Sequence, residues 1–266
     1  MSRFALISLA LLLVGAVPAH GEDLPRELEN VDVTERLGGH VPLDATFTDE
    51  AGESVQLRDY IRGDVPVLLT MNYFGCPMLC GLQLNALLDA LGELDWAPGE
   101  NFRIVTISIN PEEGPGLARA KREAYLEELG RGEVDWTFLT GDEVEIQRVA
   151  DAVGFGFEYV EAQDEYAHPA VLTFVSPQGV VTRYLYGLLY EVRDVRLALL
   201  EAADGKIGST IDRLILSCFV YDPDANSYVQ DAMFVMRAGG ALTVLLLGGF
   251  VAALWRRERT PAPELV

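Results

Sequence analysis

Met71-Asn-Tyr-Phe-Gly-Cys76-Pro-Met-Leu-Cys80 connects an apolar segment to a segment in which leucine recurs at helical spacing. The apolar segment, residues 65–73, is typical of a strand in the centre of a sheet that is covered on both faces. The leucines at positions 79, 82, 87, 88 and 91 form one face of a helix that packs on this sheet. The quoted stretch therefore predicts a junction between strand and helix that carries two of the three cysteines of the chain.

Cys76 and Cys80 are four residues apart at this junction. In a helix, residues at this spacing lie on one face about one turn apart, so the two sulfurs point toward the same place. The amide N–H groups and the dipole at a helix N-terminus favour the thiolate form, which binds metals and attacks disulfides. The pair therefore predicts a site for a soft metal or for redox chemistry. Buried structural cysteines, or a disulfide without further chemistry, are the alternative.

The third cysteine, Cys218, follows a segment in which Ile207 and Ile211 mark one face of an amphipathic helix. Its place on that apolar face predicts a packed thiol, and a third ligand or redox partner is the alternative. Structural zinc sites need four ligands, and the chain has no second cysteine pair to complete one with Cys76 and Cys80. A structural zinc site is therefore not predicted.

Residues 1–21 have the features of a secretory signal peptide, because Arg3 is followed by an apolar run and then by small residues. The chain is therefore expected to be exported, into a compartment where a disulfide is permitted. The apolar run, residues 4–17, is short for a membrane span of about 20 residues. An uncleaved N-terminal anchor is accordingly the weaker alternative.

Residues 238–255 are an uncharged apolar stretch just long enough to cross a bilayer, and Arg256, Arg257 and Arg259 follow it. The positive-inside rule predicts a single transmembrane helix with the arginine tail in the cytoplasm and residues 22–237 on the other side. A buried helix of a globular domain is the alternative. The predicted location is the inner (cytoplasmic) membrane, with the functional domain on the periplasmic side.

The chain is strongly acidic, with 41 Asp plus Glu against 20 Lys plus Arg and a net charge of −21. A surface of this sign repels phosphate groups, which argues against nucleic acid as a partner. It keeps a protein soluble, and it also steers a basic protein or a cation toward the surface.

Residues 41–205 carry alternating strand and helix patterns that suit one α/β core. A strand leads into the cysteine helix, a further strand and helix follow, and a hairpin and a closing helix end the domain. This is the order of elements in the thioredoxin-like fold. Strands are expected near residues 41–49, 55–57, 65–73, 102–109, 133–139, 170–175 and 180–186, and helices after residue 76, up to residue 129, at 143–153 and at 192–203.

Three histidines are present, and only one is well placed to join the cysteines. His20 leaves with the signal peptide and His40 lies in the N-terminal arm, whereas His168 immediately precedes a predicted strand. In a thioredoxin-like fold the loop before that strand lies against the start of the cysteine helix. Two thiolates and one imidazole form a soft ligand set that suits Cu(I). A histidine at the surface, or one used only for hydrogen bonding, is the alternative.

Four motifs spread over about residues 42–205 carry a resemblance to a known family. They are Phe47-Thr-Asp-Glu-Ala-Gly, Asn72-Tyr-Phe-Gly-Cys76-Pro-x-x-Cys80, Ile107-Ser-Ile-Asn-Pro111 and Tyr166-Ala-His168. With these motifs the chain resembles the Sco/SenC family of copper-binding assembly proteins for cytochrome c oxidase. The resemblance implies a thioredoxin-like fold in which Cys76, Cys80 and His168 bind copper for delivery to, or redox preparation of, the copper A centre. The implied partners are the copper A subunit of the oxidase and a copper donor protein.

The chain departs from the family pattern in two places. Ala167 stands where the family has Asp before its histidine, and Glu112-Glu-Gly-Pro replaces an Asp-rich turn. No carboxylate that would orient the imidazole of His168 is therefore apparent. In addition, Pro169 resembles the proline that thioredoxins place opposite their redox cysteines, which favours disulfide chemistry.

The sequence predicts a membrane-anchored copper chaperone rather than an enzyme, with Cys76, Cys80 and His168 as metal ligands and no catalytic residue. The alternative is a thiol-disulfide oxidoreductase that uses Cys76 and Cys80 to reduce the copper-ligand cysteines of the oxidase subunit. Three intervening residues suit shared chelation better than the tight disulfide loop of thioredoxins. A peroxidase of the peroxiredoxin type would need Thr where Tyr73 stands.

The predicted divisions are a signal peptide (1–21), an N-terminal arm (22–40), a thioredoxin-like copper-binding domain (41–205), a juxtamembrane segment (206–237), a transmembrane helix (238–255) and a cytoplasmic tail (256–266).

Overall fold

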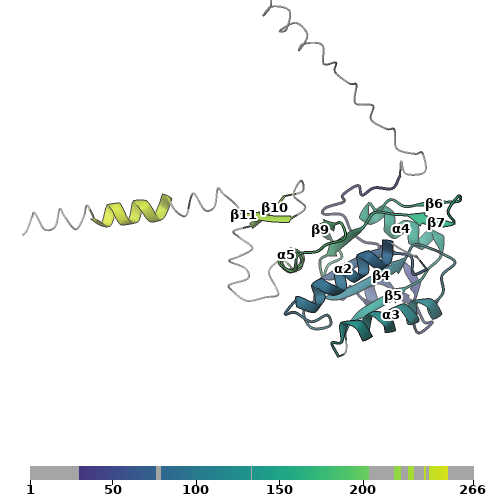
Figure 1. Ribbon diagram of the computed structural model, residues 1–266. Helices are drawn as coiled ribbons and strands as arrows, with labels where there is room; N and C mark the ends of the chain where they lie inside the picture. The colour runs from purple at the N-terminus through teal and green to yellow at the C-terminus, as the bar shows by residue number, and fades with distance from the viewer. Residues whose placement is uncertain are drawn as a thin grey trace, which may run out of the picture.

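The computed structural model describes residues 30–75, 79–132, 134–203, 219–222, 227–230, 237 and 240–250. Five strands form its central sheet: β3 (Val67–Asn72), β4 (Arg103–Ser108), β5 (Trp136–Leu139), β8 (Val171–Val175) and β9 (Val181–Tyr186). They lie in the order β5-β4-β3-β8-β9 (Figure 1). β3, β4 and β5 are parallel to one another, whereas β8 is antiparallel to β3 and to β9. The C-terminal end of β3 therefore lies beside the N-terminal end of β8.

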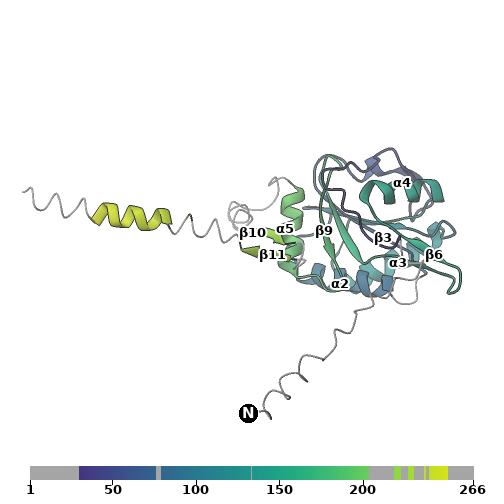
Figure 2. The same ribbon diagram turned by 90° about the horizontal axis from the view of Figure 1, so that it is seen from above.

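Four helices cover this sheet: α2 (Leu79–Glu93), α3 (Pro115–Leu129), α4 (Glu143–Val153) and α5 (Val192–Ala202). Figure 2 shows α4 on one side of the sheet and α2 and α3 on the other. Side chains of β3 alternate between two cores, because Leu68 packs with residues of α2, α3 and α5, whereas Leu69 and Met71 pack with residues of α4. All residues of β3 and β4 are buried, as expected for strands that are covered on both faces.

The order of these elements confirms the predicted α/β architecture of thioredoxin type. The helix expected at residues 143–153 has those bounds, and the strands expected near residues 41–49 and 55–57 are present as β1 (Thr46–Thr48) and β2 (Ser54–Gln56), which pair in a hairpin. The strand expected from residue 133 begins only at Trp136. It starts late because the backbone N–H of Asp135 is directed to the carbonyl of Pro98 instead of to the neighbouring strand.

Two short hairpins are additions to the predicted elements. β6 (Glu158–Val160) pairs with β7 (Glu165–Ala167) immediately before β8, and β10 (Phe219–Asp222) pairs with β11 (Ser227–Gln230). The first hairpin is rich in charged residues and only three residues long per strand, so its sequence lacks the apolar alternation of a half-buried strand. Its second strand ends at Ala167, directly before His168.

The predicted terminal segments lie wholly or partly outside the described residues. This applies to the signal peptide at 1–21, to Cys218 and to the tail at 256–266, while the predicted span at 238–255 is described, apart from its two ends, as a helix at 240–250. Within the ranges given above, no helix combines the length and the apolar character needed to cross a bilayer.

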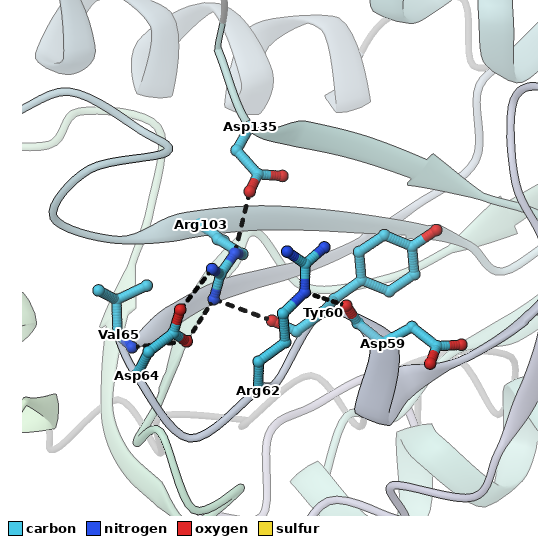
Figure 3. Close-up of polar contacts among 7 residues, drawn as sticks. All are labelled: Asp59, Tyr60, Arg62, Asp64, Val65, Arg103 and Asp135. Carbon is cyan, nitrogen blue, oxygen red and sulfur yellow. Dashed lines mark hydrogen bonds and ion pairs between the residues drawn. The ribbon is translucent and has the colours of Figure 1, made fainter.

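A buried arginine joins the loops at the N-terminal ends of the three parallel strands (Figure 3). Arg103, at the start of β4, is 6% exposed. Its guanidinium donates two hydrogen bonds of 2.7 Å to the carboxylate of Asp64, before β3, and one of 2.9 Å to Asp135, before β5. Because a buried cation is tolerated only when it is paired, this cluster fixes the relative positions of the three strand starts.

The ion pair makes the stability of the fold dependent on pH. The hydrogen bonds from Arg103 hold the pKa of the Asp64 carboxyl well below its usual range. A carboxyl with a lowered pKa in the folded state contributes stability that is present above its unfolded pKa and is lost as the pH falls through the folded value. We therefore expect Asp64→Asn to lower the free energy of unfolding at neutral pH by about 1 kcal/mol, a modest value because the side chain is 52% exposed.

The measurement is urea denaturation of the full chain from about pH 7 to about pH 2. Over this range the wild type should lose a large part of this contribution, and the variant should show a flatter dependence below about pH 4. Asp89→Asn, on the exposed side of α2, is the matched control and should follow the wild type. Parallel pH curves for the wild type and Asp64→Asn would contradict the role given to the ion pair.

Candidate metal centre

The structure describes the three predicted ligands to different extents. His168 is described in full, between β7 and β8. Cys80 is described as the second residue of α2 by its backbone, whereas its side chain and the whole of Cys76 lie outside the described residues. Among the side chains that are described, no group of three or more histidines, cysteines or carboxylates is arranged to hold a metal ion. The position of the candidate site therefore follows from the segments that carry the three predicted ligands.

His168 is buried beside the strand that leads to Cys76. The imidazole is 5% exposed, and its ring centroid lies 6.2 Å from that of Tyr73, in an edge-on arrangement, and 6.1 Å from that of Phe155. Tyr73 directly follows β3 and is three residues from Cys76. The contact confirms that the loop before β8 meets the start of the cysteine segment, as the thioredoxin-like order predicts.

The protonation of His168 suits metal binding. Burial lowers the pKa of His168, and the hydrogen bond to Pro169 only partly opposes this effect. Its Nδ1 lies 3.1 Å from the carbonyl oxygen of Pro169, and because a carbonyl only accepts hydrogen bonds, Nδ1 carries the proton. Nε2 is then the unprotonated nitrogen, the form in which an imidazole nitrogen can bind a metal. A main-chain carbonyl thus orients the imidazole, a role for which the sequence offers no carboxylate.

A buried amide links the three segments that carry the predicted ligands. Asn72 Nδ2 donates to Gln83 Oε1 over 2.9 Å, and Gln83 Nε2 donates to the carbonyl of Val171 over 2.9 Å. Asn72 and Gln83 are both fully buried. Asn72 ends β3 four residues before Cys76, Gln83 lies one turn after Cys80 in α2, and Val171 begins β8 three residues after His168. This hydrogen-bonded chain, which we call the Gln83 relay, was not anticipated from the sequence.

A carboxylate holds the loop that leads to Cys76. Glu113 accepts hydrogen bonds from the backbone N–H groups of Phe74, over 2.7 Å, and Gly75, over 2.6 Å, and from Ser108 Oγ over 2.5 Å. Glu113 belongs to the Glu112-Glu-Gly-Pro turn that departs from the family pattern. Its carboxylate therefore orients the backbone beside Cys76.

His40 lies at the other end of the sheet. It forms an isolated backbone bridge with Val180, in the turn between β8 and β9, and its side chain is exposed. His168 precedes the opposite end of β8, a strand of five residues that spans about 16 Å. The structure therefore separates His40 from the predicted ligand set.

Comparisons with known proteins identify the family to which the chain is similar. The sequence model of the SCO1/SenC family matches residues 36–194. A crystal structure of a protein from Aquifex aeolicus VF5 is similar over 64% of this chain and 96% of its own, with 25% identity and a TM-score of 0.55. No curated protein gives a significant match.

Two further solved structures are similar to this chain at lower identity. BsSco, a member of the Sco family of cytochrome c oxidase assembly proteins in which a disulfide switch was identified, is 19% identical, with 66% of this chain and 100% of its own covered and a TM-score of 0.51. Copper-bound yeast Sco1 is 17% identical, with coverage of 67% and 93% and a TM-score of 0.47.

The Gln83 relay generates a prediction about stability. Gln83→Leu removes a side chain that both donates and accepts, so the buried amide of Asn72 and the carbonyl of Val171 lose their partner. Leaving such groups unpaired should lower the free energy of unfolding by about 2 to 4 kcal/mol, measured by urea denaturation of the full chain. Asn85→Leu, at an exposed position of the same helix, is the matched control and should change stability by less than about 0.5 kcal/mol. Equal stability of the two variants would refute the role of the relay.

Proposed function

The chain belongs to the SCO1/SenC family, and on this basis we propose that it is a copper-binding assembly factor that supports maturation of the copper A centre of cytochrome c oxidase. The observation that carries the proposal is the Gln83 relay, because it ties together the segments of Cys76, Cys80 and His168 at one end of the sheet. Copper is the cargo in this proposal, and the oxidase subunit and a copper donor protein are its partners.

The donor set fits copper in its reduced form. Two thiolates and a neutral imidazole are soft or borderline ligands, and Cu(I) accepts three of them without the fourth ligand that structural zinc requires. Burial keeps His168 neutral, which is the form that binds a metal. The donors therefore match Cu(I) in number, charge and softness.

Each neighbouring residue has a definite task in this proposal. Glu113 fixes the backbone before Cys76, and the Pro169 carbonyl holds the imidazole so that Nε2 is the ligand atom. Tyr73 and Phe155 flank the ring of His168 and limit the access of water to it. Copper binding releases the thiol protons of Cys76 and Cys80, so oxidation of the pair to a disulfide should exclude the metal.

The copper proposal is tested by titrating the reduced full chain with Cu(I) against a competing chelator. One copper per chain is expected, and Cys76→Ser or Cys80→Ser should abolish tight binding because each removes a thiolate. His168→Ala should weaken binding by at least about tenfold, whereas His40→Ala, the matched control, should leave it unchanged. Unchanged affinity in both cysteine variants would refute the site.

The same histidine variants separate copper delivery from disulfide chemistry in cells. If delivery is the function, deletion of the gene should lower the activity of the copper A oxidase, and added copper should restore part of it. His168→Ala should then behave like the deletion, since it removes a ligand but leaves both thiols. Full oxidase activity in the His168→Ala strain, or rescue of the deletion by a small thiol reductant but not by copper, would instead establish thiol-disulfide exchange as the function.

We also propose that residues 238–255 anchor the chain in the inner membrane with the copper-binding domain on the periplasmic side. In support, the described helix at 240–250 exposes Leu242, Val244, Leu245, Leu246, Leu247 and Phe250. An exposed apolar surface of this kind is typical of a segment that contacts lipid or another protein. The arginines that follow favour a cytoplasmic tail.

The orientation predicts that a reporter that works only in the cytoplasm is active when it is fused after Val266. A reporter that works only in the periplasm should be inactive at that position and active after residue 205. These activities are measured in intact cells. The reverse pattern at both positions would overturn the proposed orientation.

A further inference from the structure

A groove with an aromatic floor opens beside the proposed copper site. It lies between the β6–β7 hairpin and the loop that follows β4, and consists of two adjoining hollows of about 240 and 260 Å³. Both hollows are lined by Pro111, Tyr159 and Tyr166. Tyr159 is 47% exposed, so its ring is accessible from solvent.

The rings of the groove lead from the surface to the copper site. Tyr159 lies 5.2 Å from Tyr166, and Tyr166 lies 5.7 Å from Tyr73, measured between ring centroids. Tyr73 in turn contacts His168. Tyr166 is also only two residues before His168 in the chain. A molecule that occupies the groove is therefore placed next to the residues that would hold copper.

The walls of the groove carry charge of one sign. Its lining includes the carboxylates of Glu112, Glu143, Glu158 and Asp164, and no lysine, arginine or histidine. The sequence has no Lys or Arg between Arg148 and Arg183, a range that contains the whole hairpin. By contrast, α3 carries three basic residues, Arg119, Lys121 and Arg122, as well as three glutamates.

The nearby carboxylates contribute to the raised pKa values of Tyr159 and Tyr166. The hydrogen bond to Asp164, burial and the nearby carboxylates of Asp164, Glu112 and Glu161 raise the pKa of Tyr159 to about 12. Burial and then Glu112, Glu143 and Glu113 raise the pKa of Tyr166. The charged groups that raise the pKa of the two rings are carboxylates, and the lining of the groove is acidic, so the potential at its aromatic floor is negative.

We propose that this groove binds an arginine- or lysine-bearing segment of the partner protein with which copper is exchanged. The inference rests on the proposed function for the identity of the partner. A guanidinium stacks on the face of a tyrosine and forms charge-assisted hydrogen bonds with carboxylates at the same time, so an aromatic floor with acidic walls is complementary to it. Docking there brings the partner beside Tyr73 and His168.

The test uses the peptide acetyl-Gly-Arg-Gly-Arg-Gly-amide, titrated into the copper-free full chain at low and at high salt, with its glutamate counterpart as the opposite probe. The double variant Glu112→Gln/Glu158→Gln and the single variant Tyr159→Ala should each weaken binding of the arginine peptide by at least about fivefold at low salt. Tyr159→Phe keeps the ring and should retain most of the binding.

The matched control is Glu123→Gln/Glu127→Gln, on the exposed face of α3, which changes the net charge by the same amount. It should weaken binding by less than about twofold, because the two carboxylates are away from the groove. An equal loss in both double variants, no loss in the groove variants, or equal binding of the glutamate peptide would overturn the proposal.

The outcome is distinguishable from a failure of the copper proposal. Peptide binding is measured without copper, and neither Glu112 nor Glu158 is among the proposed ligands or the residues that hold them. The Glu112→Gln/Glu158→Gln variant should therefore keep the Cu(I) affinity of the wild type. Loss of copper binding only in the cysteine variants, and of peptide binding only in the groove variants, would support both assignments separately.

Discussion

The position of the cysteine helix depends on the side-chain amide of Gln83. Apolar packing alone lets a helix shift on a sheet at little cost, because dispersion contacts have no preferred direction. The amide of Gln83 is directional, since its oxygen accepts from Asn72 and its nitrogen donates to the carbonyl of Val171. Leaving either bond unmade inside the core would cost about 1 to 3 kcal/mol, so α2 is fixed relative to β3 and β8 together.

One end of the central sheet carries a stabilising ion-pair cluster, and the other end carries the segments of the predicted ligands. At the N-terminal ends of the parallel strands, Arg103 and its carboxylates hold three loops in one place. At the C-terminal ends, where α/β proteins generally place their functional groups, the chain places Glu113 and the predicted ligand segments. The stabilising cluster and the proposed copper site are therefore separated by the length of the parallel strands.

Much of the fold could be predicted from the sequence because it is encoded in local periodicity. The apolar run of β3 and the amphipathic pattern of α4 are long enough to be unambiguous, and they fix the order of elements that places His168 against the cysteine segment. The Gln83 relay could not be predicted, because a glutamine among leucines does not reveal which distant backbone group it meets. The β6–β7 hairpin was missed for a different reason, since its strands are short and charged and are held by tertiary contacts. The Pro169 carbonyl has no sequence signature at all, as every residue has one.

Glu113 fixes the backbone conformation of a loop to which it does not belong. It is 39 residues from Phe74 and 38 from Gly75 in the chain, and the groups that it accepts from are their main-chain N–H groups. Every amino acid except proline supplies such a donor. As far as this anchoring is concerned, position 74 therefore accepts any residue except proline, whereas a Cβ at position 75 would lie only 3.2 Å from Glu113 Oε1. The conformation of this loop therefore depends on one distant glutamate. A substitution of Glu113 would alter the loop without changing any residue in it.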